Sequence, residues 1–92
     1  MARRENSAKL KLTVGRRVAE LRRDRGWTQE RMAERLDCSV QWLSRIEGGG
    51  ENVTLDTLVS LANTLGVTAI DLLTVGAEEP RRRPRTKGRP KK

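Results

Sequence analysis

The sequence predicts an all-α fold, a compact domain of five short helices followed by a basic C-terminal tail. Apolar side chains recur three or four residues apart along most of residues 10–76, as they do on the buried side of a helix. Each of these runs is bounded by a residue type that begins or ends helices, with Ser or Thr before it or Gly after it. The 92 residues are enough for one domain with a modest core, which must be largely aliphatic because the chain has no Phe or Tyr.

The N-terminal part of the chain predicts a short arm and a first helix. Residues 1–9, MARRENSAK, are polar and show no periodicity, so we expect them to form a flexible arm. A helix is expected over residues 12–25, where three apolar side chains recur at helical spacing: Val14, Val18 and Leu21. Gly26 then stands where a left-handed residue would end this helix.

Residues 28–47 predict two further helices joined by a tight turn. The apolar stripe of the first is Met32, Ala33 and Leu36, and that of the second is Val40, Leu43 and Ile46. Thr28 and Ser39 precede the two stripes, where a hydroxyl group can accept from the free N–H groups of a first helical turn. Only two residues separate the first stripe from the Ser39 cap, so the chain must reverse sharply. This arrangement is typical of a helix-turn-helix.

The second helix of this motif presents polar side chains on its outward face. With Ser39 as its cap, the outward positions are Gln41, Trp42, Ser44 and Arg45. A helix fits the major groove of DNA, where Gln41 can make two hydrogen bonds to adenine and Arg45 two to guanine. Val40, at the edge of this face, either contacts a thymine methyl group or belongs to the core.

The stretch resembles the helix-turn-helix of the phage-repressor and Cro-like (XRE) family. Gln29 opens the first helix, Ala33 is the small residue at the crossing, and the five apolar positions are filled by Met32, Leu36, Cys38, Leu43 and Ile46. The resemblance covers residues 12–75 and departs from the family at Asp37, where Gly is usual. It implies a lambda-repressor-like DNA-binding domain over residues 10–76. It also implies a transcriptional regulator of prokaryotic or phage type that binds double-stranded DNA as a homodimer.

The resemblance also assigns roles to four residues. Arg22 would form an ion pair with Glu47, which closes the recognition helix, and so tie the first helix to the third. Gln29 would bond a DNA phosphate and brace the recognition helix. Trp42 would pack along the sugar-phosphate backbone, with coverage of the core edge as the alternative.

A glycine loop and a fourth helix are expected after the motif. Residues 48–50, GlyGlyGly, must end the recognition helix. The family often carries a basic residue in this loop, but here Glu51 stands there, which leaves Asn52 as the possible phosphate donor. The fourth helix would run from a Thr54 cap to Gly66, with five core positions: Leu55, Leu58, Leu61, Ala62 and Leu65.

A short fifth helix completes the expected domain. Thr68, with Asp71 three residues later, resembles a capping box, and the helix would end near Thr74. Two of its apolar residues are expected to continue the core, Ile70 and Leu73. Two others are left either for additional core or for a dimer contact, Leu72 and Val75.

Most of the excess positive charge lies in residues 77–92. This tail has 8 basic and 2 acidic residues, against 12 and 10 in residues 1–76, so it accounts for +6 of the net charge of +8. Because it has three Pro and no large apolar side chain, we expect it to be disordered. Its core sequence resembles an AT-hook that would lie in the minor groove: Lys87, Gly88, Arg89 and Pro90. A plain polybasic segment that binds phosphate is the alternative.

The composition argues against several other classes of protein. The chain has no His and a single Cys, so neither a disulfide nor an evident metal or acid-base site is expected. No apolar run is long enough to span a bilayer. We therefore expect a cytoplasmic protein that is not an enzyme and that needs no cofactor, small-molecule ligand or membrane. An antitoxin-type module that binds a protein partner and represses its own operon is the alternative function.

Overall fold

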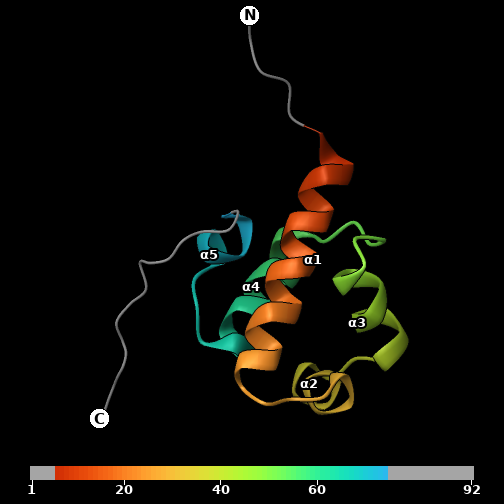
Figure 1. Cartoon of the computed structure of the whole chain (residues 1–92), viewed down its shortest axis with the longest axis vertical. Helices are drawn as coiled ribbons and strands as arrows, with labels where there is room; N and C mark the ends of the chain where they lie inside the picture. Colours follow the sequence, from red (N-terminus) through yellow and green to blue (C-terminus); the bar gives the residue numbers. More distant parts are fainter. Residues whose placement is uncertain (1–5, 75–92) are drawn as a thin grey trace, which may run out of the picture.

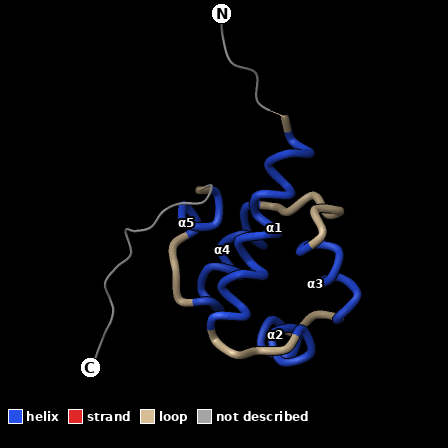
Figure 2. Tube along the Cα trace, viewed as in Figure 1, coloured by secondary structure: helices blue, strands red, loops and turns tan. Residues whose placement is uncertain are grey.

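The computed structural model describes residues 6–74, which form five helices and no strand. The helices are α1 (Ser7–Asp24), α2 (Gln29–Leu36), α3 (Val40–Glu47), α4 (Leu55–Leu65) and α5 (Ala69–Leu73). Helix α1 runs through the middle of the domain, between α3 on one side and α5 on the other (Figure 1). It contacts α3, α4 and α5, while α2 packs on α3 and α4. The loops between these helices are short (Figure 2). The all-α, five-helix fold is therefore confirmed.

Helix α1 begins earlier than the sequence predicted. It starts at Ser7, so residues 7–9 are helical and the expectation of a flexible arm was wrong for them. The Asn6 side chain caps the helix by accepting from the backbone N–H groups of residues 8 and 9, at 2.9 and 3.3 Å. This first turn is exposed and has no apolar stripe, so periodicity carried no signal there. Residues 1–5 lie outside the described part of the chain.

The other helix boundaries follow the caps that the sequence predicted. The side chains of Thr28, Ser39, Thr54 and Thr68 each accept a hydrogen bond from the backbone N–H three residues later. Thr68 also forms the expected capping box with Asp71. Gly66 ends α4 in the left-handed conformation, with φ of 75°. Local hydrogen bonding therefore determines where these four helices begin.

The core is aliphatic and is shared by all five helices. Its buried members are Val14, Val18, Leu21, Met32, Ala33, Leu43, Ile46, Leu58, Leu61, Ala62, Leu65 and Leu72. Leu36, Cys38 and Val40 are partly buried against this cluster. The apolar stripes expected on the first three helices are therefore the ones that pack. Within residues 6–74, no helix is both long enough and apolar enough to cross a membrane.

Two expectations for the core were wrong. Leu55 was assigned to it, but this first residue of α4 is 80% exposed. Ile70, also assigned to the core, is 68% exposed. Leu72 is fully buried, so of its two alternatives, additional core or a dimer contact, the structure places it in the core. Helix α5 has only five residues, so its sequence does not determine which side faces inward. Packing against α1 and α4 decides that orientation.

Gly15 allows α1 and α3 to cross closely. It is buried, and a Cβ atom at this position would lie 2.3 Å from the carbonyl oxygen of Ile46 and 2.7 Å from that of Glu47. No side chain fits in that space, so the last turn of α3 rests directly on the backbone of α1. Glycine in a helix interior lowers stability by about 1 kcal/mol relative to Ala. At Gly15 the absence of a side chain allows the close crossing that positions α3.

Candidate nucleic-acid interface

The turn between α2 and α3 is tight and well hydrogen-bonded. Asp37 takes the left-handed conformation, with φ of 60° and ψ of 50°, where the family that the sequence resembles usually has Gly. The backbone N–H of Cys38 then donates to the carbonyl oxygen of Ala33 at 2.9 Å. Asp tolerates this conformation better than most residues because its short polar side chain can hydrogen-bond locally. The turn therefore forms without glycine and sets α3 against α2.

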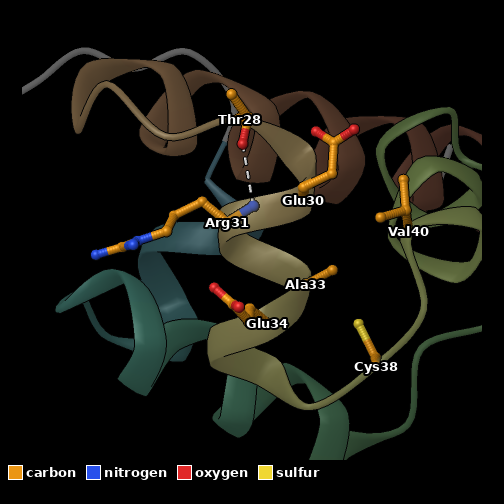
Figure 3. A pocket seen from close by; sticks show the side chains of 7 residues that line it. All are labelled: Thr28, Glu30, Arg31, Ala33, Glu34, Cys38 and Val40. Atoms are coloured by element: carbon orange, nitrogen blue, oxygen red, sulfur yellow. Dashed lines mark hydrogen bonds between the residues drawn. The ribbon is translucent and has the colours of Figure 1, made fainter.

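An open hollow lies on the surface between α2 and the start of α3. Figure 3 shows the side chains that line it: Thr28, Glu30, Arg31, Ala33, Glu34, Cys38 and Val40. Two carboxylates and one guanidinium group make this surface slightly acidic, which does not favour an anion. Across residues 6–74, no group of three or more Asp, Glu, Cys or His side chains could hold a metal ion.

Cys38 lies at the edge of this hollow with its thiol partly buried. Burial raises the pKa of the Cys38 thiol, and the neighbouring carboxylate of Asp37 raises it further. Because only the thiolate reacts with alkylating agents, we expect iodoacetamide to modify Cys38 several times more slowly in the folded protein than in the urea-unfolded chain. In the folded protein the alkylation rate should increase with pH, and the midpoint of this increase should lie above the ordinary thiol pKa of about 8.5. Equal rates in both states would contradict this prediction.

The outward face of α3 is polar and accessible. Gln41, Ser44 and Arg45 are exposed, as is the cap residue Ser39. The Ser39 hydroxyl oxygen accepts from the backbone N–H of Trp42 at 3.1 Å, so this side chain shapes the helix end as well as lying at the surface.

Val40 and Trp42 lie at the edge of the α3 face. Both are partly buried and pack against the core cluster. Val40 therefore belongs partly to the core and Trp42 covers the edge of the core, which was one of the two alternatives for each. Part of each side chain remains accessible beside the polar face.

Arg22, in the last turn of α1, and Glu47, at the end of α3, form an ion pair. The Arg22 Nε lies 2.7 Å from Glu47 Oε2, and Nη2 lies 3.1 Å from Oε1, so the contact is bidentate. The side chains are only 12% and 8% exposed. The third donor, Nη1, reaches the carbonyl oxygen of Trp27 at 2.7 Å. The ion pair that the resemblance implied is thus present, and it fastens the C-terminal end of α3 to α1.

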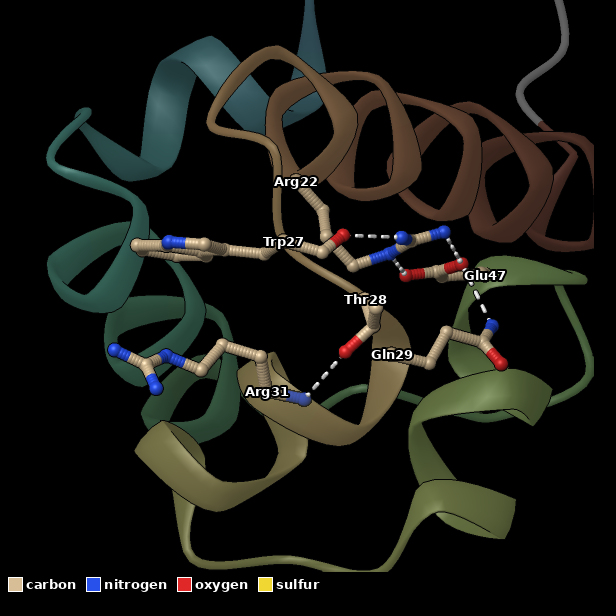
Figure 4. A network of polar contacts seen from close by, with 6 residues as sticks. All are labelled: Arg22, Trp27, Thr28, Gln29, Arg31 and Glu47. Atoms are coloured by element: carbon tan, nitrogen blue, oxygen red, sulfur yellow. Dashed lines mark hydrogen bonds and ion pairs between the residues drawn. The ribbon is translucent and has the colours of Figure 1, made fainter.

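Gln29 joins the same network from α2. Its side-chain Nε2 donates to Glu47 Oε1 at 2.9 Å (Figure 4). One carboxylate therefore connects three helices, through Arg22 on α1, Gln29 on α2 and its own position on α3. The bracing part of the role implied for Gln29 is present, since the amide holds the end of α3.

The loop after α3 contains a contact that the sequence did not reveal. The Glu51 side chain points back toward α3, so that its Oε2 accepts a hydrogen bond from Nε of Arg45 at 2.6 Å. Arg45 is the residue expected to recognise guanine. The pair is surface-exposed, with side-chain exposures of 56% for Arg45 and 27% for Glu51. A spacing of six residues across a helix end is not one at which side chains regularly meet. Asn52, the expected phosphate donor, is exposed in the same loop.

Four expected site residues lie outside the described part of the chain. They are the AT-hook-like positions Lys87, Gly88, Arg89 and Pro90.

Gly15 helps to position the site, but it was not singled out from the sequence. A glycine inside a helical apolar pattern usually has a packing reason, and that pattern could have identified it.

Comparisons with known proteins agree with this architecture. A family model described as a helix-turn-helix domain matches residues 13–74. The chain is 45% identical over 67 residues to y4dJ of Sinorhizobium fredii, named as an uncharacterized HTH-type transcriptional regulator, covering 73% of this chain and 87% of that protein. It is 38% identical over 56 residues to the immunity repressor of Bacillus phage phi105, covering 61% of this chain but only 39% of the repressor. A solved structure, the hypothetical transcription factor NHTF from Neisseria, has a TM-score of 0.70 at 25% identity, with 82% of this chain and 86% of that chain covered. The chain belongs to the helix-turn-helix domain family.

Proposed function

We propose that the protein is a sequence-specific DNA-binding transcriptional regulator and not an enzyme. The observation that carries this proposal is the exposed polar face of α3, a helix whose C-terminal end is bonded to α1 and α2 on its other side. Gln41, Ser44 and Arg45 face outward, while Glu47 fixes the end of the helix to α1 and α2. Rigid support matters because base recognition requires donors and acceptors to be placed accurately against the groove edge. The names of the relatives, a transcriptional regulator and a phage repressor, support the same function.

The proposed contacts fall into two classes. Gln41 and Arg45 would read adenine and guanine in the major groove, with Val40 beside a thymine methyl group. Gln29 and Asn52 would bond phosphate and help to set the register, and Trp42 would pack along the sugar-phosphate backbone. Ser39 and Ser44 would lie against the DNA on the same face of α3. The four AT-hook-like residues would add contacts in the minor groove or to the backbone. A regulator of this kind would work in the cytoplasm.

We propose that the regulator binds as a homodimer to two half-sites about one helical turn apart. Exposed apolar side chains on α4 and α5 support a protein contact there: Leu55, Val59 and Ile70. Leu55 and Val59 are four residues apart on α4 and so lie on the same side of that helix. Leu72, considered earlier for this role, is buried, and Val75 lies outside the described residues.

Selection of bound duplexes from a random-sequence pool tests this function. With the full-length protein at about 150 mM salt, where nonspecific phosphate contacts are weakened, we expect an inverted repeat with fixed spacing. Arg45→Ala should lose the preference for guanine at one position of each half-site and bind the selected site about 5- to 100-fold more weakly. Arg23→Ala, which removes an exposed charge from α1, is the matched control. Recovery of only A·T-rich tracts, or of no motif, would refute sequence-specific binding by α3.

A further inference from the structure

Glu51 is placed so that it controls what Arg45 can bind. The backbone N–H of Gly50 donates to the carbonyl oxygen of Arg45 at 2.8 Å, which turns the chain back along the last turn of α3. Gly49 permits this reversal with φ of 80°. The turn brings the Glu51 carboxylate to 2.6 Å from Arg45 Nε. A loop that could have offered a cation to DNA therefore presents an anion beside the recognition helix.

The contact uses one donor of Arg45 and leaves the others available. A guanidinium group has five N–H donors in a rigid plane, of which Nε carries one and the two terminal nitrogens carry four. Glu51 occupies the Nε donor, and within residues 6–74 neither Nη1 nor Nη2 of Arg45 donates a hydrogen bond to another residue. Guanine offers O6 and N7 as a pair of acceptors on its major-groove edge. The two terminal nitrogens can meet this pair while the carboxylate holds Nε.

The same carboxylate disfavours the competing contact of Arg45 with phosphate. A long, exposed arginine can reach the DNA backbone of any sequence, and such contacts add affinity without discrimination. A carboxylate beside the guanidinium cancels its net charge locally and repels an approaching phosphate. The loss of attraction is greater for a charged phosphate than for the neutral edge of a base, since the latter binds through directional hydrogen bonds.

We propose that Glu51 is a specificity-determining residue, which directs Arg45 toward a base and away from the phosphate backbone. This inference rests on the DNA-binding function proposed above. Glu51 would weaken binding to nonspecific DNA, which explains why an acidic residue stands in a loop where a basic residue would raise overall affinity.

Binding measurements on Glu51→Gln test the proposal. Full-length protein would be titrated against the selected site, the same site with Arg45's guanine replaced by adenine, and a duplex of unrelated sequence. Glu51→Gln should bind the unrelated duplex about 3- to 10-fold more tightly near 100 mM salt, with a salt slope steeper by about 1. Its guanine-to-adenine discrimination should fall at least threefold. In an Arg45→Ala background, Glu51→Gln should leave discrimination at that position unchanged.

Glu20→Gln is the matched control. Glu20 forms an exposed ion pair with Arg17 at 3.0 Å, and removing it changes the net charge by the same amount. Arg17 also donates to the carbonyl oxygen of Asp71 on α5, which lies on the opposite side of α1 from α3 (Figure 1). The control should alter neither discrimination nor the salt slope appreciably.

Two outcomes would overturn the proposal in different ways. If Glu51→Gln strengthens binding to all three duplexes by the same factor, Glu51 acts only through its charge and does not determine specificity. If the wild-type protein itself binds all three duplexes equally, the proposed function fails and this inference fails with it.

Discussion

Arg22→Met should lower the free energy of unfolding by about 3–5 kcal/mol, the cost typical of leaving one partner of a buried ion pair alone. The substitution keeps a side chain of similar length but removes all three donors that Arg22 supplies. The Glu47 side chain, 8% exposed, would then have lost its ion-pair partner, and among the described residues it would keep only the hydrogen bond from Gln29. Domains of this size have total stabilities at the low end of about 5–15 kcal/mol, so the variant would retain only about 0–2 kcal/mol of stability at 25 °C.

Urea unfolding followed by circular dichroism measures this loss. Arg23→Met is the matched control, because Arg23 is the neighbouring residue of the same helix and is exposed; it should change stability by less than about 0.5 kcal/mol. The double variant Arg22→Met/Glu47→Leu should regain part of the loss, since the stranded charge is gone. A double variant no more stable than Arg22→Met would show that the cost does not come from the unpaired carboxylate.

Gly15→Ala should destabilise the domain by about 2 kcal/mol, although Ala is ordinarily the better helix former. The helix-propensity gain is about 1 kcal/mol, and forcing an extra methyl group into a packed contact costs about 1–3 kcal/mol. The upper part of that range applies here because the new Cβ would meet backbone oxygens of Ile46 and Glu47, at 2.3 and 2.7 Å. Backbone cannot rotate away as a side chain can. Helix α3 would have to move, so affinity for the selected DNA site should fall as well.

Gly48→Ala separates this effect from the general effect of replacing glycine. Gly48 has φ of −86°, and a Cβ there would come no closer than 3.5 Å to another atom, the carbonyl oxygen of Ser44. We expect its unfolding free energy to stay within about 0.5 kcal/mol of the wild-type value. If Gly15→Ala were instead more stable than the wild type, α1 and α3 would be able to separate slightly without cost, and the close crossing would not be what positions α3.

Local chemistry in the sequence determined most of the helices and the exposed face of α3. The hydroxyl caps at Thr28, Ser39, Thr54 and Thr68 act within three residues of themselves, so their role could be inferred without knowledge of the fold. The apolar stripes of α2 and α3 have two turns each, which is enough to define one buried side. The long-range pairing of Arg22 with Glu47 was accessible only because the motif resembles a known family.

Tertiary structure alone decided the features that depend on distant partners. Ile70 is exposed where core was expected, and Leu72, which the sequence left open between core and dimer contact, is buried. Helix α5 is too short for its own periodicity to determine its buried side, so packing against α1 and α4 determines it. The same holds for Gly15, whose importance comes from two carbonyl groups about thirty residues away in the sequence, and for Glu51, which reaches Arg45 only after the glycine turn reverses the chain. Hydrogen bonds within one turn are encoded locally, whereas the closeness of two helices depends on how the whole core packs.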